Sequence, residues 1–189
     1  MPPLADRGGR RFSQAISEGD GISVIVEVDG AEVARGAEAE GAEAFVVAGD
    51  AAAIRAATDL PILCTGGTLD AAAEHGADAW AVDVDAVDAD DVVGQAARLG
   101  LEAVVRVRDE EQLERALEVH DPEIFLLAGN DVEHALELLS DVPVGKLAIV
   151  RADGLTREHV LELERRGMDA VIVPPRNVAE LVGAAPPGV

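Results

Sequence analysis

The chain has 189 residues, which is enough for one hydrophobic core and short for two domains. Its formal charge is −22, from 37 acidic against 15 basic residues, and this negative field argues against nucleic acid as a partner. Aromatic residues make up 2% of the chain, so alanine, valine, leucine and isoleucine must fill the core.

The acidic residues are spread over nearly every helix-patterned segment rather than gathered in one tail. A uniform acidic surface is typical of adaptation to a salt-rich solvent, where self-repulsion between charges is screened. No apolar run approaches the roughly 18 residues that a membrane span needs, and the single cysteine, Cys64, fits a reducing compartment. We therefore expect a cytoplasmic protein of a halophile with no membrane partner.

One short pattern recurs along the chain and predicts its architecture. Gly41, Gly76, Gly100 and Gly167 each follow a polar, helix-patterned segment and precede a short apolar run. Glycine suits the left-handed position that ends a helix, and a β-branched run suits a strand buried on both faces. The repeating unit is therefore a helix, a tight turn and a buried parallel strand.

In chain order, the predicted strands are residues 22–28, 43–48, 61–64, 79–84, 103–107, 123–127, 146–150 and 170–173. The predicted helices are a leading helix at 12–17, then 31–40, 51–58, 69–75, 88–99, 110–120, 132–139, one that opens at 156–159, and 177–182. Eight strands alternating with eight helices predict a small (β/α)8 TIM barrel with short βα loops, and an open doubly wound sheet is the alternative. We expect an arm and leading helix at residues 1–21, one barrel over 22–184, and a loose tail at 185–189.

Four segments carry a family resemblance, at residues 24–29, 59–65, 105–113 and 150–156. They look like the Ile-Ala-Glu-Ile-Lys, Leu-Pro-Val-Leu-Arg-Lys-Asp-Phe, Val-Glu-Val-His-Asp-Glu-Glu-Glu-Leu and Val-Ser-Glu-Ser-Gly-Ile segments of indole-3-glycerol phosphate synthase. From Ile22 to the last helix, the chain resembles this ribulose-phosphate-binding barrel of tryptophan biosynthesis. The resemblance implies a carbon–carbon lyase that uses no cofactor.

The catalytic residues that the resemblance implies are mostly replaced. The family has a general-acid lysine at the end of strand three and a second lysine near the strand-one glutamate, where this chain has Thr65 and Asp29. Threonine and aspartate cannot both donate a proton and stabilise negative charge as lysine does. Arg106 occupies the position of the family's strand-five glutamate. Of the family's catalytic residues, Glu27 is the one that is retained. The single lysine, Lys146, begins strand seven at the opposite end of the predicted barrel.

The loops that cover the substrate in the family are also short here. Two residues, Asp29 and Gly30, separate the first predicted strand from its helix, and Gly49 and Asp50 follow the second strand. Without lids, water is not excluded from a reaction centre. The sequence predicts a diverged barrel that has lost the synthase chemistry and binds a small anionic ligand or a protein partner, a second copy of the chain included. An active synthase with rearranged residues, or another phosphosugar isomerase or aldolase, stays open.

Four arginines lie on or just after the predicted strands five, seven and eight and form the candidate ligand-binding sector: Arg106, Arg108, Arg151 and Arg176. Guanidinium groups bind carboxylate or phosphate through paired hydrogen bonds. The alternative, which we favour, is that they form salt bridges with Asp83, Asp85, Asp109 and Asp153, and that Glu27 is paired to an arginine.

The loops after strands seven and eight are where barrels of this kind hold phosphate with backbone amides. Gly154 is retained there, Asp153 replaces a serine of the family, and Asn177 opens the last helix. Pro174 and Pro175 remove two amide donors, so we expect a damaged phosphate cup.

Other chemistry finds weaker support. Asp83, Asp85 and Asp50 could together hold a hard cation, but no further ligand supports it and we expect no metal site. The four histidines fall on predicted outer helices, which argues against a zinc cluster or a catalytic imidazole. Cys64 has no histidine nearby at the mouth, so we expect a packed thiol and not a nucleophile.

Overall fold

The computed structural model describes residues 10–129, 131–152, 154–176 and 178–182. Within them, eight parallel strands close into a barrel in sequence order, each paired with the next and β8 paired with β1. The strands are β1 (Ser23–Glu27), β2 (Ala44–Val47), β3 (Ile62–Cys64), β4 (Ala79–Asp83), β5 (Glu102–Val107), β6 (Ile124–Ala128), β7 (Leu147–Arg151) and β8 (Ala170–Val173). The predicted (β/α)8 barrel is confirmed, and the open sheet is excluded because β1 and β8 pair.

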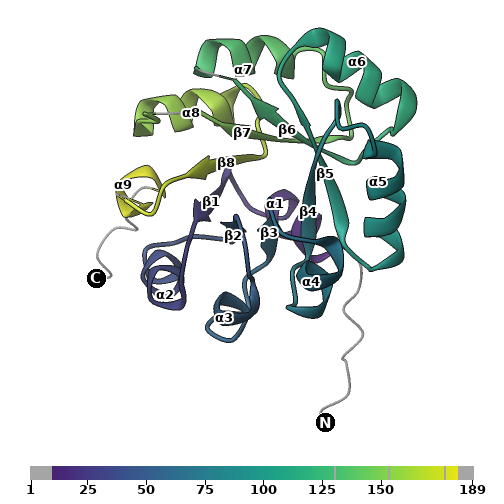
Figure 1. Ribbon diagram of the computed structural model, residues 1–189. Helices are drawn as coiled ribbons and strands as arrows, with labels where there is room; N and C mark the ends of the chain where they lie inside the picture. The colour runs from purple at the N-terminus through teal and green to yellow at the C-terminus, as the bar shows by residue number, and fades with distance from the viewer. Residues whose placement is uncertain (1–9, 130, 153, 177, 183–189) are drawn as a thin grey trace.

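The helices surround the barrel, as Figure 1 shows. They are α1 (Arg11–Ser17), α2 (Ala31–Ala39), α3 (Ala52–Arg55), α4 (Leu69–Glu74), α5 (Ala89–Arg98), α6 (Glu110–Val119), α7 (Val132–Leu139), α8 (Arg157–Arg165) and α9 (Val178–Val182). None of the helices described is long and apolar enough to cross a membrane. Residues 1–9 of the predicted arm and the predicted tail at 185–189 lie outside the described residues.

Helix α3 is much shorter than the predicted helix at 51–58. It ends at Arg55, whose guanidinium donates to the carbonyl oxygen of Thr58 at 3.1 Å and of Gly76 at 3.0 Å. The chain turns at residues 56–57, where the N–H groups of Ala57 and Thr58 both donate to the carbonyl oxygen of Ile54. The pattern of alanines therefore predicts a helix that is longer than the one observed.

The turns between helices and strands are as the repeated glycines predict. The four glycines have positive φ angles of 106°, 84°, 77° and 89° at Gly41, Gly76, Gly100 and Gly167. This conformation is costly for any residue with a Cβ, which is the physical reason for the repeat. The βα loops at the other end are short, with residues 28–30 between β1 and α2.

Side chains alternate along each strand between two apolar layers. Those that point outward pack under the helices, and those that point inward fill the barrel, as Ile25, Val46, Leu63, Val104 and Ile149 do. Because every strand is covered on both faces, the inward residue at each carboxyl-terminal strand end reaches the barrel mouth. The fold thereby sets which residues can meet there.

Helix α1 closes the amino-terminal end of the barrel. Phe12 and Ile16 are buried and pack against the inward residues of the strands. The carboxylate of Glu102, the first residue of β5, accepts hydrogen bonds from the backbone N–H groups of Phe12 at 2.6 Å and Ser13 at 3.1 Å. Burial raises the pKa of Glu102, and these hydrogen bonds partly offset the effect. The sequence predicted this helix but not its role as a plug.

Candidate functional site at the barrel mouth

The carboxyl-terminal strand ends bring together inward-facing polar residues from different parts of the chain. Glu27 ends β1, Thr65 follows β3, Asp83 ends β4, Arg106 lies near the end of β5, and Arg151 ends β7. In barrels of this fold, ligands bind at this end, because the loops there are free to vary without disturbing the core. The structure therefore places the candidate residues at the expected end.

A cavity of about 310 Å³ opens at this end, on the side of strands one, two, three, seven and eight. We call it the mouth cavity, and the described residues that line it are Glu27, Val28, Asp29, Val46, Ala48, Thr65, Arg151 and Pro175. Its volume is at the lower end of the range for small-molecule sites, about 300–1,000 Å³. The cavity combines an apolar wall with convergent polar groups.

An ion pair crosses the mouth cavity. Nη2 of Arg151 lies 2.6 Å from Oε1 of Glu27, so the bond joins β7 to β1 above the end of β8, the strand between them. The side chains are 51% and 33% exposed, which leaves other donors of Arg151 and the second oxygen of Glu27 accessible. The prediction that Glu27 is paired to an arginine is confirmed, and the partner is Arg151.

Two further polar groups face the same cavity. Asp29 is exposed just after β1 and makes no hydrogen bond or ion pair with another described residue. Thr65 is half-buried, and its hydroxyl donates to the carbonyl oxygen of Val47 at 3.5 Å. Asp29 and Thr65 occupy the two positions where indole-3-glycerol phosphate synthases, which the sequence resembles, have lysine. The structure places both residues in the same cavity as Glu27. Thr65 cannot supply a cationic proton donor to the reacting centre.

Arg106 and Arg108 lie apart from the mouth cavity and share one carboxylate. Their guanidinium groups lie 3.2 Å and 2.8 Å from the two oxygens of Asp83. The salt-bridge interpretation of these arginines is confirmed for Asp83. It is wrong for Asp85, which binds Arg115 at 2.6 Å, and for Asp109, whose side chain caps α6. The four predicted arginines therefore do not form one sector facing one ligand.

A second cavity, of about 530 Å³, lies between the loops after β7 and β8 and is called the loop cavity here. It is lined by Gly154, Leu155, Thr156, Arg157, Pro174, Arg176, Glu180 and Leu181. This is the position of the predicted phosphate cup. Asp153 and Asn177, which the sequence assigned to the same cup, lie outside the described residues.

Several donors of the loop cavity are already bound within the protein. The N–H of Thr156 donates to Nδ1 of His159 at 3.3 Å as part of the cap of α8. The N–H of Arg176 donates to the carbonyl oxygen of Pro174 at 2.7 Å, and Arg157 reaches carbonyl oxygens of α9. The guanidinium of Arg176 is exposed and makes no ion pair with any residue that the structure describes. Arg176 is therefore the cation that remains available there.

The single lysine lies at the other end of the barrel. Lys146 precedes β7, and its Nζ lies 2.7 Å from a carboxylate oxygen of Asp121. Cys64 is fully buried in the layer beneath the helices. Burial, with the nearby Asp50 and Asp78 carboxylates, raises the pKa of the Cys64 thiol to about 11, so it carries no thiolate at neutral pH. Neither residue offers chemistry to the mouth.

The carboxylates weighed as a cation site are engaged elsewhere. Asp50 binds Nδ1 of His75 at 2.7 Å, and Asp83 and Asp85 bind arginines. In the described part of the chain, no group of three or more histidine, cysteine, aspartate or glutamate residues is placed to hold a metal ion. Asp50 lies against His75 whereas Asp83 and Asp85 bind arginines, so each of the three carboxylates has a partner of its own.

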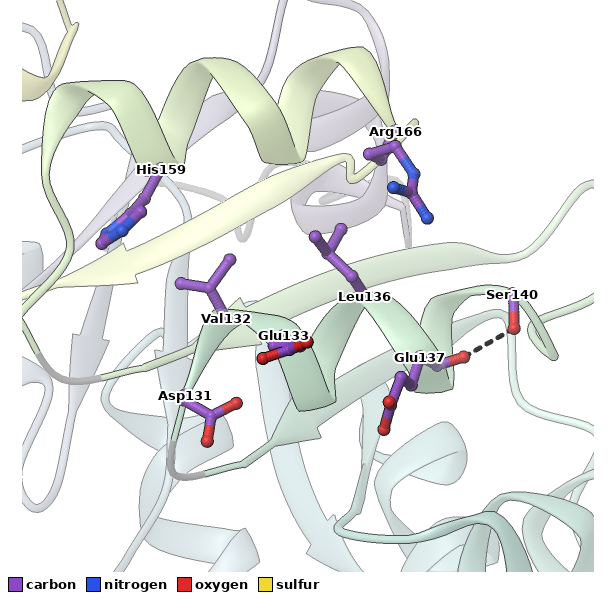
Figure 2. Close-up of a pocket in the computed structure, with 8 residues that line it drawn as sticks. All are labelled: Asp131, Val132, Glu133, Leu136, Glu137, Ser140, His159 and Arg166. Atoms are coloured by element: carbon purple, nitrogen blue, oxygen red, sulfur yellow. Dashed lines mark hydrogen bonds between the residues drawn. The ribbon is translucent and has the colours of Figure 1, made fainter.

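A third cavity, of about 860 Å³, is a groove on the outer surface between α7 and α8. Figure 2 shows the side chains of Val132 and Leu136 pointing from α7 towards α8, with Arg166 at the end of α8. Glu133 and Glu137 of α7 also line the groove. His159 lines its other end and takes part in the cap of α8. The groove lies in the helix layer, away from the strand ends where the polar residues converge.

No profile of a known protein family matches the chain. Over 133 residues, the chain is 32% identical to an indole-3-glycerol phosphate synthase of Variovorax paradoxus (strain S110). The resemblance read from the sequence is confirmed. The matched stretch covers 63% of this chain and 50% of that relative, so the chain spans half the length of the curated relative it matches.

Among solved structures, the barrel is similar to the N-acetylmannosamine-6-phosphate 2-epimerase of Clostridium perfringens. The TM-score is 0.68, with 84% of this chain and 87% of that chain covered, at 16% sequence identity. A likeness at this identity shows the fold, a TIM barrel, and not the reaction. The resemblance to the ribulose-phosphate-binding barrels therefore holds for the architecture and for a distant sequence similarity.

Sequence reasoning missed two features of the site. The first is the apolar wall of the mouth cavity, in which Val46, Ala48 and Pro175 take part. The second is that Arg151 pairs with Glu27 across a strand. Inward alternation and the order of strands around the ring were signals for this pair, because both residues end strands that flank β8.

Proposed function

We propose that this protein is a ligand-binding barrel of the indole-3-glycerol phosphate synthase type that does not carry out the synthase reaction. Its ligand is a small anion, a carboxylate or a phosphate, held at the barrel mouth. The observation that carries the proposal is the mouth cavity itself, where the Glu27–Arg151 ion pair stands beside Asp29 and Thr65 in place of two lysines.

Loss of the synthase chemistry is supported by the charges around the cavity. The reaction needs a cationic acid that can give up a proton, and arginine does not deprotonate in proteins. Arg151 is the cationic side chain among the described residues lining the mouth cavity, and it is bound to Glu27. The short segment at residues 28–30 adds no lid that would exclude water.

Anion binding is supported by two guanidinium groups near the strand ends. Arg151 lines the mouth cavity and keeps donors free beyond its bond to Glu27, and Arg176 lines the adjoining loop cavity beside Gly154. In contrast, Arg106 and Arg108 are held by Asp83 and are less available. The proposed anion site therefore includes fewer arginines than the four that the sequence suggested, and Arg151 is at its centre.

We also place this function in a salt-rich cytoplasm. The formal charge of −22 is spread over the helix layer, where it would repel itself at low ionic strength. The melting temperature should therefore rise as KCl increases into the molar range. A melting temperature that does not change with KCl would contradict the halophilic assignment and leave the binding proposal intact.

The deciding experiment is turnover of the carboxyphenylamino-deoxyribulose phosphate substrate in molar KCl, followed by fluorescence of indole glycerol phosphate. We expect no product, and a rise in melting temperature with this compound or with inorganic phosphate. Arg151→Gln should remove the rise, whereas Arg98→Gln, a charge change on the outer helix α5, should keep it. Product formation would overturn the proposal in favour of an active synthase. Neither product nor a thermal shift would favour association with a protein partner, tested by a pull-down.

A further inference from the structure

We infer that the ligand of the mouth cavity carries a positively charged amino group together with its anionic group, so that it is a small zwitterion. This inference rests on the proposed function, since it specifies the ligand of the same cavity. It follows from the balance of donors and acceptors around the ion pair between Glu27 and Arg151.

The mouth cavity has more acceptors than donors among its described residues. Glu27 uses Oε1 for Arg151, which leaves Oε2, and both carboxylate oxygens of Asp29 have no described partner. The hydroxyl of Thr65 donates its hydrogen to the carbonyl oxygen of Val47, so its oxygen can act only as an acceptor towards the cavity. A ligand that supplies only acceptors would leave all of these groups without protein or ligand donors.

The charge balance leads to the same conclusion. Two carboxylates, Glu27 and Asp29, face one guanidinium, Arg151, so the lining carries a net negative charge. A purely anionic ligand gains a bond to Arg151 but meets repulsion from Asp29. An ammonium group offers three N–H donors and one positive charge, which match the unbound oxygens of Asp29 and Glu27.

One ligand can use both ends of this arrangement. Arg151 has five N–H donors, and its bond to Glu27 runs through Nη2, so an anionic group can bind the remaining edge without breaking the pair. The cavity of about 310 Å³ holds a ligand of roughly ten non-hydrogen atoms, taking about 30 Å³ for each water-sized group. Val46, Ala48 and Pro175 then cover the carbon chain between the two charges.

The test uses two matched pairs of probes that differ by the amino group alone. These are 4-aminobutyrate against butyrate, and O-phosphoethanolamine against ethyl phosphate, titrated by NMR in molar KCl. We expect each amino compound to bind about tenfold more tightly than its partner, since hydrogen bonds between charged groups contribute more than neutral ones. Equal affinity within both pairs would overturn the inference and leave anion binding standing. No binding of any probe would overturn the inference and the anion-binding proposal together.

Two variants assign the preference to this cavity. Asp29→Asn should weaken the amino compounds about tenfold and leave butyrate and ethyl phosphate unchanged or slightly tighter, because the repulsive charge is removed. Asp91→Asn makes the same charge change on the exposed face of α5 and should alter neither class. Arg151→Gln should weaken all four probes. A preference for amines that survives in Asp29→Asn would contradict the assignment.

Discussion

The two ends of strand β4 carry aspartates with similar partners and very different surroundings. Asp78, just before the strand, lies 2.6 Å from Arg55 and 3.5 Å from Arg11, and Asp83, at its end, lies 3.2 Å and 2.8 Å from Arg106 and Arg108. The side chain of Asp78 is 5% exposed, whereas that of Asp83 is 38% exposed. The two aspartates therefore differ in their exposure to solvent and not in the number of arginines that they contact.

The same contrast holds for the two ends of the barrel as a whole. At the amino-terminal end, α1 and the carboxylate of Glu102 seal the barrel, and Asp78 also accepts the N–H of Ile62 at 2.9 Å. At the mouth, the Glu27–Arg151 pair stands beside a cavity. A buried pair such as Asp78–Arg55 serves stability, while a half-exposed pair such as Glu27–Arg151 can exchange its bond for a ligand.

The largest expected effect is at the sealed end. Phe12→Ala should lower the free energy of unfolding by about 4 kcal/mol, because a fully buried ring leaves a cavity between α1 and the strands. Urea unfolding in molar KCl measures it. Val87→Ala, at an exposed position between β4 and α5, should change stability by less than about 0.5 kcal/mol. Equal effects would mean that α1 is not part of the core.

A matched pair of aspartates gives the sharpest test of the comparison. Asp78→Asn should cost about 3 kcal/mol, since it removes a buried carboxylate charge that lies 2.6 Å from Arg55, and Asp83→Asn should cost less than about 1 kcal/mol. Both variants keep the side-chain shape, so the difference reports charge and burial. If the two costs were alike, burial would not be the deciding variable.

At the mouth, the Glu27–Arg151 pair should contribute little to stability. A double-mutant cycle with Glu27→Gln and Arg151→Gln should give a coupling energy below about 1 kcal/mol, because both side chains are part-exposed and salt screens them. Chemical unfolding of the four proteins measures it. A coupling energy of several kcal/mol would mean that the pair mainly stabilises the fold, and it would count against the ligand-binding proposal.

The smallest effect at neutral pH concerns Cys64, which is buried in the layer beneath the helices. With its pKa raised to about 11 from 9.0, the folded protein retains the thiol proton that the unfolded chain releases. The contribution of this group to stability is therefore complete below about pH 9 and is lost as the pH rises to about 11. A Cys64→Ala variant should lack this part of the pH dependence. Labelling of native Cys64 by a thiol reagent at neutral pH should be slow, and rapid labelling would contradict its burial.

Patterns within short stretches of the chain were sufficient to predict the barrel. The short apolar runs and the glycine after four of the helices are local properties, and such patterns placed β8 at residues 170–173 and α7 at residues 132–139 as observed. The mouth residues Glu27 and Arg151 were also predictable, because parallel strands bring their carboxyl-terminal ends to one side. The pairing of Glu27 with an arginine was predicted, but its partner was not.

The tertiary structure decided which groups meet. Arg151 reaches Glu27 because the ring closes through β8, and Arg106 and Arg108 converge on Asp83 because β4 and β5 are neighbours. Arg55 reaches Asp78, 23 residues further along the chain. Such contacts join residues distant in sequence, and no local periodicity encodes the distances between them. The sequence alone determined the fold and which residues lie at the carboxyl-terminal ends of the strands. Closure of the barrel decided which charges are buried and which remain available to a ligand, because solvent exposure is set by packing and not by residue type.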